Sequence, residues 1–419
     1  MDKKLKKEIL SDKQIKKFTS YGFLKNLKFF EPYLIIYLLA NNLTLFQIGI
    51  LISIKEIIVN VFEIPSGFVA DYFGKKKELC TCFIFYIISF MFFFFSRGFY
   101  LAMIAMIFFG LGEAFRSGTH KAMIYTYLEQ KNWSNHKTFV YGKTRSGSLI
   151  GSAVSSILGI IIILNVPSSG YIFLLSTIPY ILDFLLILSY PNDLDKGDVE
   201  VTSFTEMIIS FKNSLIKNKK LRVLILNESI FEASIASIKD FVQPIMKMII
   251  IGSGFIIIQS MNADQNLKLI IGLVYAVINI FSAVASKKAY LLKKQKTNMT
   301  VLNILYVSLI VSLIFLGCFI DMPIVVIIIF IIINLLLNLR KPIFVDEIDN
   351  HMAKKERATM LSVSSQMKSL MKVFIAPMIG FIADKSGIHM VMYFLAGLLV
   401  FFMLLLVIKK NKEKSINIY

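Results

Sequence analysis

The sequence has few of the residues that catalysis, metal binding or disulfide formation require. It contains three cysteines and four histidines in 419 residues. Cys80, Cys82 and Cys318 lie in or beside apolar segments without metal or redox spacing, so we expect free thiols. No phosphate-binding loop, zinc-ligand spacing or nucleophile elbow occurs. We therefore expect no enzyme activity, no cofactor and no bound metal.

Charged residues are also scarce, at 17% of the chain, whereas 56% of the residues are hydrophobic. A soluble protein could not cover that much apolar surface with so few charges. Runs such as FIFYIISFMFFFF and VVIIIFIIINLLLNL approach or reach the ~20 residues that a membrane-spanning helix needs. The net charge of +19 falls in short clusters between these runs, so nucleic acid is not an expected partner. The composition predicts an all-α, multi-pass membrane protein.

Hydropathy and loop breaks predict about twelve spanning helices. Their approximate extents are 22–41, 46–70, 78–96, 99–126, 146–164, 169–189, 222–250, 268–290, 299–319, 323–345, 359–382 and 388–408. Every second loop is rich in Lys and Arg, whereas the loops ANNLTLFQ and NVPSSG contain neither. This alternation places both termini in the cytoplasm and the chain in the cell membrane. The segment 248–261 is interpreted as a helix end plus an extracellular amphipathic loop; the alternative is an extra span.

A long polar segment near mid-chain separates two halves of about six helices each. The predicted parts are a cytoplasmic basic tail (1–21), an N-terminal bundle (22–190), a cytoplasmic central loop (191–220), a C-terminal bundle (221–408) and a second basic tail (409–419). The halves echo each other, since AFRSGTHKAMI follows the fourth span and NLRKPIFVDEI follows the tenth. Two related halves are typical of secondary transporters. We expect two pseudo-symmetric six-helix bundles.

The stretch EIPSGFVADYFGKKK follows the second predicted span. Its pattern is Gly67-x-x-x-Asp71-x-x-Gly74-x-Lys76-Lys77, which resembles the loop signature of the major facilitator superfamily between helices two and three. RATMLSV and PMIGFIADKSG are similar to that family's second half. The overall pattern looks most like bacterial drug-efflux permeases, including the clostridial tetracycline-efflux branch. That branch has the pattern E-x-P-x5-D-x3-basic-basic, matched here by Glu63, Pro65, Asp71, Lys75 and Lys76.

Two losses from the family pattern leave the direction of transport open. The fifth-helix antiporter signature keeps small residues such as Ser152 and Ser156 but has lost its proline, and the arginine expected just before the glycines of helix four is missing. Tyr72 occupies the loop position that is usually basic, which weakens one expected contact. The resemblance implies that the loop acts as a gating latch. Gly67 would let a neighbouring helix approach closely, and Asp71 would accept bonds from a helix N-terminus or basic group. The gating lysines would hold the loop near anionic lipid, or would only orient the chain: Lys75, Lys76 and Lys77.

Ionisable residues inside predicted spans are expensive to bury and usually functional. The candidates for binding substrate or protons are Glu31, Glu56, Glu63, Glu113, Arg116, Glu228 and Glu232. Glu113 and Arg116 share a helix face and should pair. Glu228 and Glu232 lie one turn apart with no cation within one turn on their own helix, so they fit a shared proton carrier best. The alternative is a structural pair with a cation on another helix, and Asp183 is also interpreted as structural.

Three functions fit these observations. The first is proton-coupled export of an amphipathic small molecule or drug, whose partners would be substrate, protons and membrane lipids. The second is uptake or facilitated transport of a metabolite, organic anion or lipid, since Lys25, Lys28 and Arg116 could bind an anion. The third is a non-transporting membrane sensor or scaffold. The resemblance favours the first, and we expect the protein to act as a monomer.

Overall fold

The computed structural model describes residues 3–195, 219–253, 257–288, 297–349 and 357–416, and these residues contain helices but no strand. The chain divides into two compact units. Unit 1 comprises Met1–Leu43, Ile54–Val201 and Asp264–Asn279, and unit 2 comprises Thr44–Ser53, Thr202–Ala263 and Ile280–Tyr419. The units therefore do not coincide with the predicted halves, because two helices, α4 (Leu45–Phe73) and α12 (Ala263–Lys288), contribute to both.

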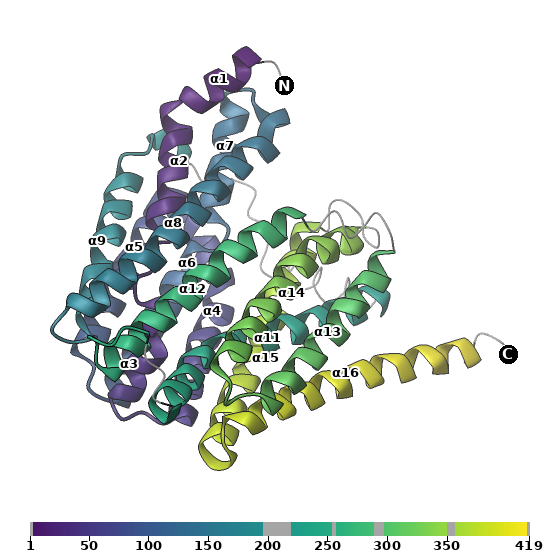
Figure 1. Ribbon diagram of the computed structural model, residues 1–419. Helices are drawn as coiled ribbons and strands as arrows, with labels where there is room; N and C mark the ends of the chain where they lie inside the picture. Colours follow the sequence, from purple (N-terminus) through teal and green to yellow (C-terminus); the bar gives the residue numbers. More distant parts are fainter. Residues whose placement is uncertain (1–2, 196–218, 254–256, 289–296, 350–356, 417–419) are drawn as a thin grey trace. The chain divides into compact units, whose positions relative to one another are not determined.

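Unit 1 is built around a bundle in which α2, α5, α8 and α9 run beside one another (Figure 1). Besides its parts of α4 and α12, unit 1 contains the following elements: α1 (Lys3–Ser11), α2 (Lys13–Leu24), η1 (Glu31–Tyr33), α3 (Leu34–Ala40), α5 (Lys75–Phe95), α6 (Phe99–Arg116), α7 (Thr119–Gln130), η2 (Ser134–His136), α8 (Lys137–Asn165), α9 (Tyr171–Leu188) and η3 (Asn192–Asp195). Aromatic rings fill its interior. Phe90, for example, is fully buried and contacts the rings of Tyr180 and Phe30, which is how a phenylalanine-rich sequence packs a core.

Unit 2 places α11 against α14 and α15, and α13 against α14 and α16. These helices are α11 (Lys219–Ser253), α13 (Asn298–Cys318), α14 (Pro323–Asp349), α15 (Arg357–Ser386) and α16 (Ile388–Ile416). Helix α11 is long and contains charged side chains, some of which are paired with cations of the same unit.

Ten of the described helices are long and apolar enough to cross a membrane. The predicted span 222–250 lies within α11, which carries several charges, and the predicted span 22–41 is interrupted, since α2, η1 and α3 divide it. Between Ser253 and Ala263, where α11 ends and α12 begins, too few residues remain for a further spanning helix. The segment 248–261 is therefore better described as the end of α11 and the connection to α12 than as an additional span. The all-α multi-pass fold is confirmed.

Residues before the proposed boundary at 21 are helical and contribute buried side chains to unit 1. Residues 3–24 form α1 and α2, and Ile15, Phe18 and Tyr21 are buried in the bundle. Asp12 caps α2 by accepting from the Ile15 N–H at 2.9 Å. In the predicted central loop, 196–218 lies outside the described residues. The predicted tail 409–419 begins as the end of α16.

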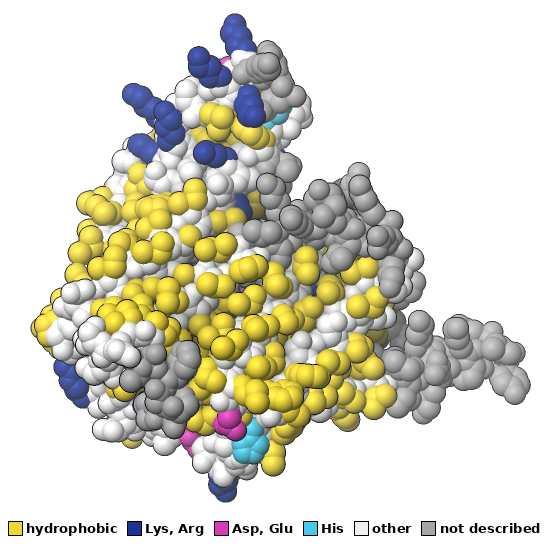
Figure 2. Space-filling model, in the orientation of Figure 1, with side chains coloured by type: hydrophobic (Ala, Val, Ile, Leu, Met, Phe, Trp, Pro, Cys, Tyr) yellow, Lys and Arg dark blue, Asp and Glu magenta, His cyan; other side chains and the backbone are white. Residues whose placement is uncertain are grey.

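The outer surface is apolar where the helices are longest. Val61, Ile161 and Phe374 are each more than half exposed, which would be unfavourable in water but suits contact with lipid chains. Figure 2 shows apolar side chains across the middle of the face in view and Lys and Arg side chains gathered at the end of unit 1 that carries α1. This distribution fits a membrane protein with one basic end.

Candidate functional site

The basic end of the loop motif, Gly74–Lys77, is hydrogen-bonded to the segment that follows α9. Gly74 has φ of 102°, and a Cβ on it would lie 2.3 Å from Oδ1 of Asp195, so only glycine fits. The same Asp195 oxygen accepts from the Lys76 N–H at 2.8 Å, and Lys76 Nζ donates to the Tyr190 carbonyl at 3.0 Å. The buried Lys75 and the bound Lys76 are therefore not free for lipid headgroups. Of the three gating lysines, Lys77 is exposed.

The other end of the motif differs from expectation at Gly67. Among the described residues, no atom lies within 4 Å of where a Gly67 Cβ would be, so the predicted close approach of a neighbouring helix is absent here. The side chain of Asp71 lies outside the described part of the chain. Its role as a latch stays a prediction.

A second copy of the motif occurs at the end of α15, and it was missed by the sequence reasoning. GFVADYFG (67–74) ends α4, and GFIADKSG (380–387) ends α15. Each copy finishes on a glycine with positive φ, 102° at Gly74 and 87° at Gly387. The aspartate of the second copy, Asp384, accepts from two N–H groups in the first turn of α4, Leu45 at 3.1 Å and Phe46 at 2.8 Å. Comparing the two helix ends letter by letter would have found this repeat.

The acidic candidates of unit 1 are bonded to neighbours. Glu113 lies between Lys28 Nζ, at 3.5 Å, and Arg116, as predicted for the Glu113–Arg116 pair. Glu63 accepts from the Ser117 hydroxyl at 3.0 Å. Two further candidates are separate from this cluster: Glu56 pairs with Lys55 at 2.8 Å, and Glu31 is exposed in η1.

The acidic candidates of unit 2 are also paired, with cations on other helices, which was the alternative to a shared proton carrier. Glu228 Oε2 accepts from Arg340 Nε at 2.6 Å, and both side chains are almost completely buried. Glu232 lies 3.2 Å from Lys368 Nζ and 3.5 Å from Lys341 Nζ. The cations come from α14 and α15, so a search along α11 alone could not find them. Glu228 and Glu232 therefore form ion pairs with cations on other helices.

Arg340 is the functional residue that the sequence reasoning overlooked. Its guanidinium lies 4.1 Å from the centre of the Phe231 ring and also donates to the Leu302 carbonyl at 3.2 Å. It occupies the same position in NLRKPIFVDEI as Arg116 does in AFRSGTHKAMI. Each half of the sequence thus supplies one arginine that binds a buried or half-buried glutamate.

Asp183 on α9 is the unusual acid of unit 1. Its side chain is fully buried, and neither carboxylate oxygen has a hydrogen-bond partner among the described residues. A buried carboxylate without a donor is strongly unfavourable as an anion. The neutral, protonated carboxyl group is the form that this site accommodates.

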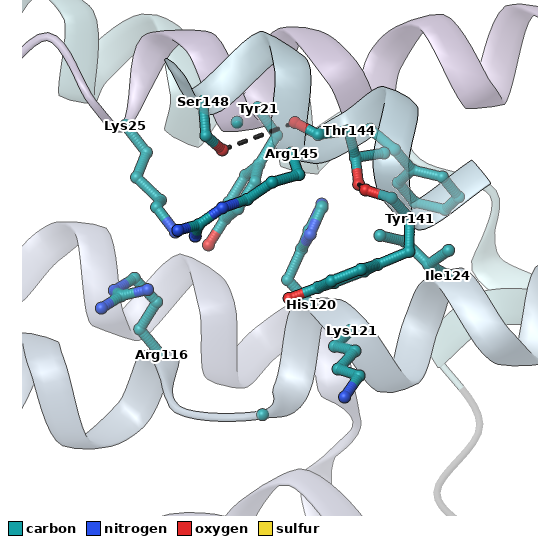
Figure 3. Close-up of a pocket in the computed structure, with 13 residues that line it drawn as sticks. Tyr21, Lys25, Arg116, His120, Lys121, Ile124, Tyr141, Thr144, Arg145 and Ser148 are labelled. Atoms are coloured by element: carbon teal, nitrogen blue, oxygen red, sulfur yellow. Dashed lines mark hydrogen bonds between the residues drawn. The ribbon is translucent and has the colours of Figure 1, made fainter. Parts of the chain in front are cut away.

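A cavity of about 220 Å³ opens in unit 1 beside α2, α7 and α8. Figure 3 shows side chains from these elements extending into it. The cavity is basic: Lys25, Arg116, Lys121 and Arg145 line it, and no Asp or Glu is among the lining residues. Apolar and aromatic groups complete its wall, including the stacked rings of Tyr21 and His120, whose centres lie 3.6 Å apart.

Solved structures with a similar fold are transporters. A crystal structure of the nucleoside transporter NupG superposes with a TM-score of 0.77 at 13% identity, covering 94% of this chain and 98% of that chain. A bacterial homologue of the human lysosomal transporter Spinster has a TM-score of 0.70 and a D-xylose–proton symporter one of 0.67, both at 13% identity. At this identity the likeness shows the fold alone.

Sequence comparison gives the family. The chain is 28% identical over 232 residues to an uncharacterised MFS-type transporter, YxaM, of Bacillus subtilis strain 168, an alignment that covers 52% of this chain and 54% of that protein. It thus spans about half of the relative's length. A family profile described as Major Facilitator Superfamily matches residues 23–374. Because this match covers most of the sequence, the chain belongs to the Major Facilitator Superfamily.

Proposed function

We propose that the protein couples transport of its substrate to protons and that Asp183 is the proton-carrying group. The observation that carries this proposal is the fully buried Asp183 carboxyl group without a hydrogen-bond partner among the described residues. Glu228 and Glu232, which the sequence favoured, are held by cations and are less suited to exchange a proton.

We propose an amphipathic small molecule as the substrate and export as the direction. The aromatic interior of unit 1 supports an amphipathic substrate, and the resemblance of the Glu63–Lys77 loop to efflux permeases supports export. A second candidate is uptake of an organic anion, which the basic cavity favours. The two directions differ in whether substrate moves against or with an imposed proton gradient.

Replacing Asp183 with Asn is expected to abolish proton movement coupled to substrate while leaving substrate exchange intact. Asn imitates the protonated acid in shape but has no proton to exchange. Proteoliposomes loaded with a pH-sensitive dye would be given ethidium or carboxyfluorescein as probes, and the rate of internal pH change should fall at least about tenfold. The exposed Asp193→Asn variant is the matched control. Unchanged proton flux in Asp183→Asn would exclude this residue as the carrier.

We also propose that both termini are cytoplasmic in the cell membrane, because basic loops alternate with loops lacking Lys and Arg. Tags fused to the N-terminus and to the C-terminus should both resist protease added outside intact cells and be cut after the cells are opened. A tag cut in intact cells would contradict this orientation and would require an odd number of spans between the termini.

A further inference from the structure

We infer that the basic cavity of unit 1 binds the anionic group, a phosphate or carboxylate, of a small aromatic ligand. The inference rests on the proposed function in one respect, since it names the chemistry of the substrate. It uses a different set of residues from proton coupling: Lys25, Lys121 and Arg145 around the cavity, with Arg116 in its wall.

The cations around the cavity are not matched by acids that line it. Arg116 already binds Glu113 and donates to the Tyr86 hydroxyl at 3.1 Å. Among the described residues, Lys25, Lys121 and Arg145 have no carboxylate within ion-pair distance. Cations that share one small cavity repel each other unless an anion lies between them. A bound anion would supply the charge that the chain itself does not provide there.

Two cations of the cavity differ in burial from lysines that only orient the chain. Lysines that only orient a membrane protein are exposed, as Lys77 of α5 and Lys143 of α8 are. Of the cations that line the cavity, Lys25 and Arg116 are half-buried, whereas Lys121 and Arg145 are exposed at its mouth. Figure 3 shows the Lys25 and Arg145 side chains extending into the cavity. Ordering and partly desolvating cations is costly unless they are used in binding. The distribution is that of a binding site.

Aromatic rings lie beside the cations of the cavity and can contact the aromatic part of the ligand. Lys121 Nζ lies 5.4 Å from the centre of the Tyr141 ring, and Tyr21 and His120 stack on one another. These rings offer flat surfaces beside the cations, on which an aromatic group can stack while its acid meets Lys25 or Arg145. A volume of about 220 Å³ admits a single ring with one acidic group, and is small for a drug-sized ligand.

The test measures binding by purified protein in neutral detergent, without a gradient, so a failure of proton coupling does not affect it. Phenyl phosphate and benzoate are expected to raise the apparent Tm with increasing concentration, because a ligand that binds the folded state stabilises it. Benzylamine, which has the opposite charge, is expected to leave Tm unchanged. Equal stabilisation by benzylamine would overturn the inference.

Variants locate the effect. Lys25→Gln and Arg145→Gln should each weaken phenyl phosphate binding at least about tenfold, the loss expected for one charge-assisted contact. Arg145 is exposed, so its replacement keeps the fold if Lys25→Gln does not. The control is Lys143→Gln, which removes an exposed lysine of α8 that does not line the cavity. Equal affinities in Arg145→Gln and Lys143→Gln would overturn the inference.

A lipid phosphate is the other source of the same chemistry, and nanodiscs distinguish it. If phosphatidylglycerol competes with phenyl phosphate for the parent, and phosphatidylcholine does not, the cavity binds anionic headgroups and the anion site stands with a lipid as its ligand. If phenyl phosphate binds equally in both lipids, the ligand is a free small molecule. No stabilisation by any anion, soluble or lipid, would refute the site.

Discussion

Replacing Arg340 with methionine is expected to lower the apparent Tm of the purified protein by several degrees Celsius. The methionine fills a similar volume but leaves Glu228, 1% exposed, without the guanidinium that lies 2.6 Å from its carboxylate. Removing one partner of a buried ion pair typically costs about 3–5 kcal/mol, because the remaining charge is desolvated and unpaired. The lost contacts with Phe231 and the Leu302 carbonyl add to this cost.

The adjacent lysine provides a matched control. Lys341 lies on the same helix, but its side chain is 62% exposed, and it shares Glu232 with Lys368. Exposed pairs contribute at most about 1 kcal/mol, so Lys341→Met should change Tm little. The double variant Arg340→Met/Glu228→Gln should recover part of the lost Tm, because the unpaired carboxylate charge of Glu228 is then removed. If Arg340→Met is no less stable than Lys341→Met, the buried pair does not hold unit 2 together.

The fold could be predicted because hydrophobic runs and loop charges are local signals. Apolar stretches near 20 residues predict spans whatever their neighbours are, and the Gly67–Lys77 spacing indicated the family. Lys13, Lys16 and Lys17 give α2 the composition of a solvated tail, whereas Ile15 and Phe18 on the same helix are buried. A basic amphipathic helix and a basic tail have nearly the same composition.

The candidate site was predictable only where partners are close in sequence. Glu113 and Arg116 are three residues apart, and their pair was predicted correctly. The partner of Glu228 is 112 residues away, and no spacing rule connects the two. The same limit applied to Asp183, since only the packed structure shows that its carboxyl group is buried without a donor. Sequence patterns find ionisable residues in spans, but tertiary packing decides which of them are paired.

Replacing Asp384 with alanine is expected to separate the start of α4 from the end of α15 and to impair transport. Asp384 accepts from the N–H groups of Leu45 and Phe46, which have no partner within their own helix. A capping side chain contributes about 0.5–2 kcal/mol, and a carboxylate at a helix N-terminus adds about 0.3–1 kcal/mol. The two effects together, about 0.8–3 kcal/mol, can shift a two-state equilibrium about 4–160-fold.

The surrounding contacts show that this cap joins two closely packed helices. A Cβ on Gly49 would lie 2.4 Å from the Ala376 carbonyl oxygen, and one on Gly380 would lie 2.3 Å from that of Leu45. Ser53 Oγ donates to the Val373 carbonyl at 2.7 Å, further along the same contact. Small residues at this spacing let helix backbones touch in a membrane. The aspartate and the glycines of the second motif copy therefore act on the same pair of helices.

Labelling of an introduced cysteine measures whether this contact opens. In a background with Cys80, Cys82 and Cys318 replaced, Ser53→Cys is buried and should react slowly with a maleimide. Adding Asp384→Ala should raise its labelling rate about 4–160-fold, in line with the loss of the cap and of the charge at the helix N-terminus. Lys385→Ala is the control, because this neighbouring exposed residue makes no bond to α4 and contacts Phe381 instead. Equal labelling rates with Asp384→Ala and Lys385→Ala, together with parental transport, would show that the cap is not a latch. A rate that rises only with Asp384→Ala would assign the second GF-[VI]-ADxxG copy the gating role that the first copy was predicted to have at Asp71.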